Sequence, residues 1–350
     1  MSTYRDAGVD IDEGDRAVEL MKAHLAKATR PEVFGGIGGF AGLFDASALK
    51  SFKKPLLATS TDGVGTKTEF ARLLNRYDTI GEDLVAMVVD DLVVCGAEPL
   101  FMTDYIATGK VHPEKIADIV KGIARGCEKA NTALIGGETA EHPGLMADDE
   151  FDLAGAATGV VESENLLGES KVQEGDLLLA MPASGFHANG YSLIRHIVTS
   201  KNLSLEEVIP ETQKTLGEIL LTPTEIYTRD CLVLIKALGT SLHAFSHITG
   251  GGLAANTERV IPKGFCATFN RSTWTLPPEF QYLSTMGSVP QWDMERTWNC
   301  GVGMVAVIDK EASELALKTL LARGMKAWIA GEVIRSNSES RSVLRGNYIV

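Results

Sequence analysis

Apolar residues recur three and four positions apart in several long stretches of the chain, and this spacing predicts amphipathic helices. Between residues 12 and 29 the pattern places Val18, Met21 and Leu25 on one face, and Pro31 ends the helix. The segment 78–96 is apolar on nearly every side, which predicts a mostly buried helix. Further helices are expected over 112–130 and 189–200.

Shorter apolar runs that end in glycine or a polar turn predict β-strands. Because these runs alternate with the expected helices, both halves of the chain should mix sheet and helix. The strand-forming runs lie at 56–60, 99–109, 133–141, 151–162, 175–185, 243–252, 265–270 and 300–308. The run 133–141 is expected to begin as a strand and to end in a loop that carries carboxylates.

The length of 350 residues predicts about two domains, each large enough to bury its own core. The pattern breaks into a polar stretch between Glu162 and Asp176, which has the composition of an interdomain linker. We therefore expect one domain over 1–165 and a second over 166–350.

Composition excludes several classes of protein. Apolar residues make up 45% and charged residues 23%, which is typical of a globular chain. The net charge of −13 would repel a nucleic-acid backbone, so no nucleic-acid partner is expected. Five widely spaced cysteines, a polar and acidic beginning and the lack of an 18-residue apolar run predict a reduced cytoplasmic protein with no membrane partner.

Several acidic residues stand beside flexible glycines. The sequence from Ser60 to Lys67 brings Asp62, two hydroxyl groups and a lysine into one turn, which suits Mg²⁺ and a bridging phosphate, although a plain hairpin turn has the same composition. Asp90 and Asp91 interrupt the apolar run of the helix over 78–96, where buried carboxylates need partners. Two further acids, Glu138 and Glu141, follow a glycine pair in the expected loop, so the set resembles a nucleotide site with a divalent metal.

Two histidines stand at the ends of expected strands beside glycine, which is where an imidazole can reach a ligand. They are His187 and His247, although either ring could equally be a hydrogen-bonded structural group. Backbone amides of Gly250, Gly251 and Gly252 precede an expected helix start and could cradle a phosphate. Asn189 is either a neutral donor or a turn former. The glycine-rich segment 35–40 is expected to be a mobile loop whose amides can face a ligand.

Several familiar motifs are missing. The sequence has no GxxxxGK[ST] phosphate loop, no GxSxG nucleophile elbow and no HExxH zinc motif. These gaps disfavour covalent acyl chemistry and exclude the P-loop class. The residues alone indicate a soluble two-domain enzyme that uses Mg²⁺ and a phosphorylated ligand, and they do not identify the substrate.

Nine motifs in a fixed order resemble those of the phosphoribosylformylglycinamidine cyclo-ligase family, also called the aminoimidazole ribonucleotide synthetases. The match extends over nearly the whole chain. The motifs are DAGVDID (6–12), GGIGGF (35–40), TDGVGTK (61–67), DDLVVCGAEPLF (90–101), DYIATGK (104–110), GGETAE (136–141), GFHANGYSLIR (185–195), HITGGG (247–252) and RTWNCGVGM (296–304).

The resemblance implies the ATP-dependent closure of formylglycinamidine ribonucleotide to aminoimidazole ribonucleotide in purine biosynthesis. It also implies an α+β fold of two mixed domains, with an N-terminal domain that binds nucleotide and whose sheet pairs with that of a second copy in a homodimer. The C-terminal domain would complete the active-site cleft, and the glycine-rich loop would act as a lid. The substrate would be a small molecule and the cofactors ATP and Mg²⁺.

Carried over by motif, the resemblance also implies roles for single residues. Asp62, Asp91 and Glu138 would surround the metal and phosphates, with Asp91 favoured over Asp90 by register. The remaining nucleotide-binding residues would be Lys22, Gly36, Gly38, Gly39, Lys67, Thr139 and Glu141. On the substrate side, Asn189 and one of His187 and His247 would serve the chemistry, and Gly250, Gly251 and Gly252 would hold the substrate phosphate.

Two alternatives are kept beside this interpretation. Other ATP-dependent enzymes share the superfamily, and a nucleotide-binding scaffold without catalysis could keep the fold. Acids placed inside an apolar helix argue against a scaffold, which has no use for them.

Overall fold

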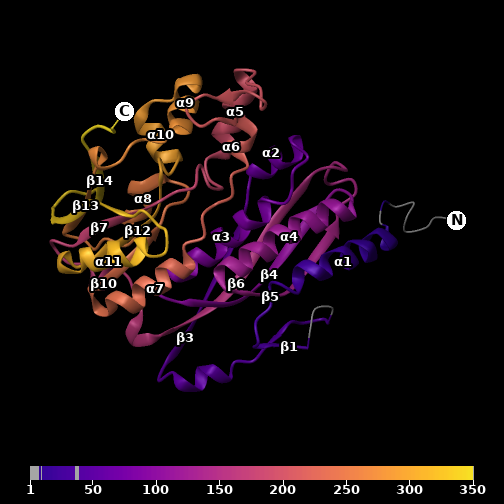
Figure 1. Ribbon diagram of the computed structural model, residues 1–350, viewed down its shortest axis with the longest axis horizontal. Helices are drawn as coiled ribbons and strands as arrows, with labels where there is room; N and C mark the ends of the chain where they lie inside the picture. The colour runs from indigo at the N-terminus through magenta and orange to yellow at the C-terminus, as the bar shows by residue number, and fades with distance from the viewer. Residues whose placement is uncertain (1–7, 9, 36–38, 350) are drawn as a thin grey trace. The chain divides into compact units, whose positions relative to one another are not determined.

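The computed structural model describes residues 8, 10–35 and 39–349, and it divides into two compact units. The first unit comprises residues 1–92 and 97–163, and the second comprises 93–96 and 164–350. Figure 1 shows the course of the chain through both. Each unit contains a β-sheet with helices packed on it, so the expected mixture of sheet and helix in both halves is confirmed.

The first unit is built on a four-stranded sheet in the order β3-β6-β4-β5. Strands β4 and β5 are parallel, and the other neighbours are antiparallel. Helix α1 packs against α4, as Figure 1 also shows. The strands are β3 (Pro55–Gly63), β4 (Glu98–Thr108), β5 (Ala133–Glu141) and β6 (Phe151–Glu162), with a short pair β1 (Val33–Phe34) and β2 (Leu43–Phe44). The helices are α1 (Ile11–Leu25), α2 (Lys67–Leu73), α3 (Ile80–Val93) and α4 (Pro113–Ala130).

Helix α3 is buried almost throughout, as the apolar run predicts. The two adjacent acids of this helix lie in different environments: Asp90 is fully buried and Asp91 is exposed. The expectation that both interrupt a buried surface is therefore wrong for Asp91, because neighbouring helical positions are turned away from one another.

Strand β5 differs from the expected strand followed by a carboxylate loop. It continues through Glu138 to Glu141, and each of these residues pairs with a position on β4. Gly136 and Gly137 lower the tendency of this segment to form a strand. The parallel pairing with β4 nevertheless supplies the hydrogen bonds that hold it extended. Both acids thus lie on a strand, which corrects the loop prediction.

The second unit contains a six-stranded sheet in the order β10-β12-β7-β13-β11-β14. All neighbours are antiparallel except β11 and β14. The strands are β7 (Leu177–Pro182), β10 (Leu242–His247), β11 (Phe265–Asn270), β12 (Val302–Ile308), β13 (Trp328–Arg335) and β14 (Ser342–Arg345), with a short pair β8 (Val208–Ile209) and β9 (Lys214–Thr215). The helices are α5 (Tyr191–Ser200), α6 (Leu216–Leu220), α7 (Thr228–Leu238), α8 (Gly252–Glu258), α9 (Pro278–Gly287), α10 (Gln291–Thr297) and α11 (Ser313–Leu321).

Both faces of the second sheet are buried. Along β12, Met304 and Ala306 belong to a core cluster that includes residues of α7 and α11, while Val305 and Val307 belong to a second cluster on the opposite face. Alternate strand residues point to opposite faces, so a strand covered on both sides must be apolar at every position. This explains why the sequence over 300–308 shows no alternation of apolar and polar residues.

Candidate functional site

A cavity of about 640 Å³ opens in the first unit beside strand β5. Its walls come from α1, α4, the segment 39–42 and strands β4 and β5, and they are largely apolar. Three residues expected to bind nucleotide line it: Gly39, Glu138 and Thr139. Gly36 and Gly38, which belong to the same prediction, lie outside the described residues. An apolar cavity of this size with a few polar groups at its edge is typical of a small-molecule site.

Asp104 of β4 also lines the cavity, and sequence reasoning assigned it no role. The carboxyl group is half-buried, and burial raises its pKa to about 7. A signal was available in the strand pattern. Met102 and Ile106, two positions away on either side, are fully buried, so an acid between them on the same face is unusual.

The three expected metal ligands belong to three elements of the first unit. Asp62 is half-buried near the end of β3, where its Oδ1 accepts a hydrogen bond from the Gly63 amide at 2.7 Å. Asp91 and Glu138 are exposed on α3 and β5. Among the described residues, these three side chains do not place one ligand oxygen each within 4.8 Å of the other two. The structure therefore does not bring their oxygens together as a preformed cage.

The two lysines expected to bind phosphate differ in exposure. Lys67 is fully buried, and its Nζ donates to Asp83 Oδ1 at 2.8 Å, where Asp83 is buried as well. Burial lowers the pKa of Lys67, against the attraction of Asp83. Lys22 lies on the exposed side of α1 and forms an ion pair with Glu19.

Glu141 holds two backbone segments together. One carboxylate oxygen accepts a hydrogen bond from the Val111 amide at 2.6 Å, and the other accepts from the Asp10 amide at 3.1 Å. These contacts link the end of β5 to the starts of α4 and α1. The residue predicted to bind nucleotide therefore has a structural role that sequence reasoning missed.

The substrate-side candidates gather at one end of the second sheet. Strands β7 and β10 finish there, on either side of the start of β12. The amide of Gly250 donates to Asn189 Oδ1 at 3.0 Å, which joins the loop after β7 to the loop after β10. His247, which is buried, is the last residue of β10. The structure thus brings Asn189 and the glycine run close together although they are distant in sequence. Their roles toward the substrate stay predictions.

His187 is buried in the loop after β7 and has a left-handed backbone with φ of 62°. Its Nε2 accepts a hydrogen bond from the Ser184 amide at 3.2 Å. A neutral imidazole that accepts at Nε2 carries its proton at Nδ1. The Nε2 lone pair is therefore engaged by backbone in this structure.

The amides of the glycine run are also engaged in part. Gly250 donates to Asn189, and Gly252 donates to the Thr249 carbonyl at 3.1 Å. A phosphate bound by these amides would replace both contacts. The substrate-phosphate role of Gly250, Gly251 and Gly252 stays a prediction.

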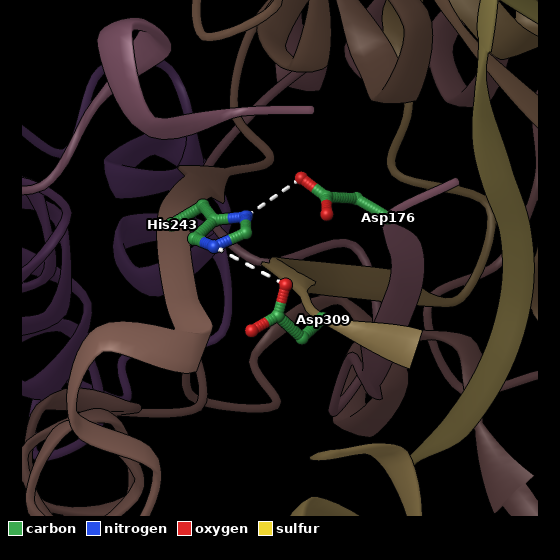
Figure 2. Close-up of side chains that lie close together, drawn as sticks. All are labelled: Asp176, His243 and Asp309. Atoms are coloured by element: carbon green, nitrogen blue, oxygen red, sulfur yellow. Dashed lines mark hydrogen bonds and ion pairs between the residues drawn. The ribbon is translucent and has the colours of Figure 1, made fainter. Parts of the chain in front are cut away.

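A second polar cluster lies at the opposite end of the same three strands, and sequence reasoning missed it. His243, the second residue of β10, lies beside Asp176, which precedes β7, and Asp309, which follows β12 (Figure 2). Its Nδ1 bonds to Asp176 Oδ2 at 2.7 Å, and its Nε2 lies 3.5 Å from Asp309 Oδ1. The hydrogen bond to Asp176 raises the pKa of His243. These groups have the spacing of metal ligands, but two carboxylates favour a protonated ring, which has no lone pair for a metal.

Within the described part of the chain, no helix combines the length and apolar character that crossing a membrane requires.

Solved structures share the fold of this chain. Thiamine-monophosphate kinase from Stenotrophomonas maltophilia K279a superposes with a TM-score of 0.68 at 16% identity, covering 95% of this chain and 97% of that one. The hydrogenase maturation protein HypE in complex with ATP superposes with a TM-score of 0.67 at 15% identity, covering 96% and 91%. At these identities the likeness establishes a shared two-unit fold.

The family is defined more narrowly by sequence. Residues 44–161 match the N-terminal domain of the AIR synthase related proteins, and residues 173–343 match their C-terminal domain. The chain belongs to the AIR synthase related protein family. The two-domain α+β fold expected from the motifs is thereby confirmed.

Curated relatives resemble the chain along nearly its full length. A phosphoribosylformylglycinamidine cyclo-ligase of Desulfitobacterium hafniense is 49% identical, covering 95% of this chain and 96% of the relative. Proteins of the same name are 46% identical in Caldanaerobacter subterraneus subsp. tengcongensis and 49% identical in Geobacillus kaustophilus, covering 95% of this chain and 97% and 95% of the relatives. The resemblance inferred from the nine motifs is confirmed.

Proposed function

We propose that this protein is an ATP-dependent cyclo-ligase that converts formylglycinamidine ribonucleotide into aminoimidazole ribonucleotide, ADP and phosphate in purine biosynthesis. The observation that carries the proposal is the identity of 46–49% over 95% of the chain to relatives bearing that enzyme name. The solved neighbour in complex with ATP supports ATP as the co-substrate.

The reaction needs no protein nucleophile. The formyl amide oxygen attacks the γ-phosphorus of ATP, and ADP leaves with the electrons of the broken bond. An amidine nitrogen then attacks the activated carbon, a proton is lost from nitrogen, and phosphate departs as the ring closes. Such a sequence demands positioned reactants and charge stabilisation more than covalent catalysis. This agrees with the missing nucleophile motifs in the sequence.

On this proposal the cavity beside β5 receives ATP, with Gly39, Glu138 and Thr139 at its wall. Its apolar surface suits a purine ring. Lys22, Lys67 and Glu141 stay predictions as nucleotide-binding residues. To bind the nucleotide, Lys67 would have to give up its contact with Asp83, and Glu141 would have to give up its hydrogen bonds from backbone amides.

Asp62, Asp91 and Glu138 would hold Mg²⁺, because hard carboxylate oxygens are the ligands this ion prefers. The separation of their oxygens is compatible with this role, since Mg²⁺ is usually bound by one or two carboxylates together with substrate phosphates and water. The ion would neutralise charge on the phosphates of bound ATP.

Of the two candidate histidines, we assign proton transfer from the amidine to His247 rather than His187. The Nε2 lone pair of His187 already accepts from the Ser184 amide. His187 and Asn189 would instead shape the loop around the ribonucleotide, and Gly250, Gly251 and Gly252 would hold its phosphate. His247 ends β10 three residues before this glycine run.

We also propose a homodimer in which the exposed face of the first sheet meets a second copy. Leu57 of β3 is 65% exposed and Tyr105 of β4 is 40% exposed, and an uncovered apolar sheet face is costly in water. The molecular mass in dilute buffer tests this: about twice 37.6 kDa is expected, and a species that stays at 37.6 kDa contradicts it.

The activity is tested by following ADP and aminoimidazole ribonucleotide in one tube with ATP and Mg²⁺, with and without formylglycinamidine ribonucleotide. Equal amounts of both products, dependent on the ribonucleotide, are expected. If ATP binds but neither product forms, the protein is a nucleotide-binding scaffold or acts on another substrate.

A further inference from the structure

We propose that Asp104 is a ligand-binding residue of the cavity and accepts a hydrogen bond from a neutral O–H or N–H donor of the bound nucleotide. The inference rests on the proposed function, because it takes ATP as the occupant of the cavity. It adds a recognition residue that the motif-based assignment did not contain.

The strand register sets where Asp104 can act. It pairs with Gly137 of β5, and Ile106 pairs with Thr139. Because paired residues share a face and successive residues alternate, Asp104, Gly137 and Thr139 belong to one face of the sheet. Asp104 and Thr139 both line the cavity. The carboxyl group therefore lies beside the space that the nucleotide would fill.

Gly137 leaves the room that this carboxyl group occupies. A Cβ atom built at Gly137 would lie 2.1 Å from Asp104 Oδ1 and 2.9 Å from its Cγ, closer than atoms can approach. Any other residue at 137 would push the carboxyl group out of its position. The glycine pair that weakens the strand signal of β5 thus has a specific packing role next to the cavity.

In the described part of the chain no cation acts on the pKa of this carboxyl group, and its charge helps to raise the pKa of the nearby buried Cys127 thiol. The only recorded hydrogen bond of the carboxyl group comes from its own backbone amide, and that bond lowers the pKa less than burial raises it. A carboxylate can only accept hydrogen bonds, and leaving one half-buried without a donor costs free energy. A ligand that supplies a donor would recover this cost on binding.

A metal role for Asp104 is an outcome that the test must separate from a hydrogen-bonding role. By strand register Asp104 shares a face of the sheet with Asp62, a proposed metal ligand, because both residues pair with Gly155 of β6. Within the described residues, Asp104 joins no group of three ligand atoms within 4.8 Å. The nucleotide offers two kinds of neutral donor that need no metal: the ribose hydroxyl groups and the 6-amino group of adenine.

The test measures dissociation constants by calorimetry for wild type, Asp104→Ala and Asp104→Asn in the full chain with Mg²⁺. The ligands are ATP, 2′-deoxy-ATP, 3′-deoxy-ATP and purine riboside triphosphate, which lacks the 6-amino group. Asp118→Asn, an exposed acid on α4, is the matched control. We expect Asp104→Ala to weaken ATP binding about 10- to 100-fold, the usual effect of a hydrogen bond to a charged group, and the control to leave it unchanged.

The analogues identify the donor. Wild type should bind the analogue that lacks the donor group about 10- to 100-fold more weakly than it binds ATP. Asp104→Ala should bind that analogue and ATP with similar dissociation constants. The inference is overturned if Asp104→Ala binds ATP with the wild-type dissociation constant. It is also overturned if the analogues bind Asp104→Ala more weakly than ATP by the same factors as in wild type, or if the variant differs from wild type only in needing a higher Mg²⁺ concentration. Failure of wild type to bind ATP at all would instead overturn the proposed function.

Unfolding of the protein without nucleotide separates binding from structure. Replacing a half-buried carboxyl by a neutral amide removes a desolvation cost, so Asp104→Asn should unfold at the same or a higher urea concentration than wild type. A clear loss of stability in Asp104→Asn would make the residue structural and contradict the inference.

Discussion

The two ends of strands β7, β10 and β12 hold their polar side chains in different ways. At one end, His187 and Asn189 are bonded to backbone amides in loops rich in glycine. At the other end, His243 lies between the carboxylates of Asp176 and Asp309. The first arrangement can be exchanged for contacts with a ligand, because neutral hydrogen bonds to loop backbone are weak. The second is a set of charged groups whose main attraction is to one another.

Strand β10 makes the comparison direct, because it carries one histidine at each end. His243 and His247 are both buried, and the strand is only six residues long. The expected difference between their roles rests on the two carboxylates, Asp176 and Asp309, that lie beside His243. We therefore expect changes at the His247 end to reduce activity and changes at the His243 end to reduce stability.

The largest expected effect is on catalysis. His247→Gln should lower kcat by about 100- to 10,000-fold, the usual contribution of a proton-transferring side chain, with little change in KM. His243→Gln, on the same strand, is the matched control and should leave kcat near the wild-type value. Steady-state formation of aminoimidazole ribonucleotide measures both. An equal decrease of kcat in the two variants would show that the two ends of the strands do not differ in their contribution to catalysis.

The next effect is on stability. Asp176→Ala leaves the buried His243 ring without its 2.7 Å partner, and breaking a buried ion pair costs about 3–5 kcal/mol. Asp309→Ala removes a partner that is 38% exposed and 3.5 Å away, so it should cost about 0–1 kcal/mol. Urea unfolding measures both free energies. A larger loss for Asp309→Ala would reverse the assigned importance of the two carboxylates.

A smaller effect is expected from crowding at the His247 end. A Cβ atom at Gly303 of β12 would lie 2.0 Å from Tyr227 Oη and 2.6 Å from His187 Cε1. Gly303→Ala should therefore destabilise the protein by about 1–3 kcal/mol and raise KM for the ribonucleotide, because it displaces His187. Gly14→Ala in α1 is the control. Nothing lies within 4 Å of its added Cβ, so it should stabilise by about 0.5–1 kcal/mol.

Local pattern predicted the elements of this fold better than it predicted its clusters. The buried helix α3 and the apolar strand β12 follow from spacing and composition, which act within a few residues. The end of β5 does not, because pairing with β4 overrides two glycines. The charge cluster joins Asp176 to His243 across 67 residues, and sequence spacing carries no record of which distant groups meet. Asp104 was missed because its meaning depends on the cavity beside it.

The smallest expected effect is the pH dependence of the His243 cluster. Hydrogen bonding to Asp176, assisted by Asp309 and opposed by Lys171 and by burial, raises the folded pKa of His243 above its ordinary value of about 6.5. The folded protein then holds this proton more tightly than the unfolded chain does. The stabilisation is fully present below about pH 6.5 and is lost as pH rises through the folded pKa.

Comparison with His243→Gln isolates this contribution, because other groups titrate in both proteins. The unfolding free energy of wild type minus that of the variant should decrease from pH 6 upward and become constant once His243 is neutral. A difference that grows with pH would mean that the ring is held neutral in the folded state. In that case the lone pair at Nε2 would be free to bind a metal ion together with Asp309, and the two ends of the strands would be more alike than their hydrogen bonds indicate.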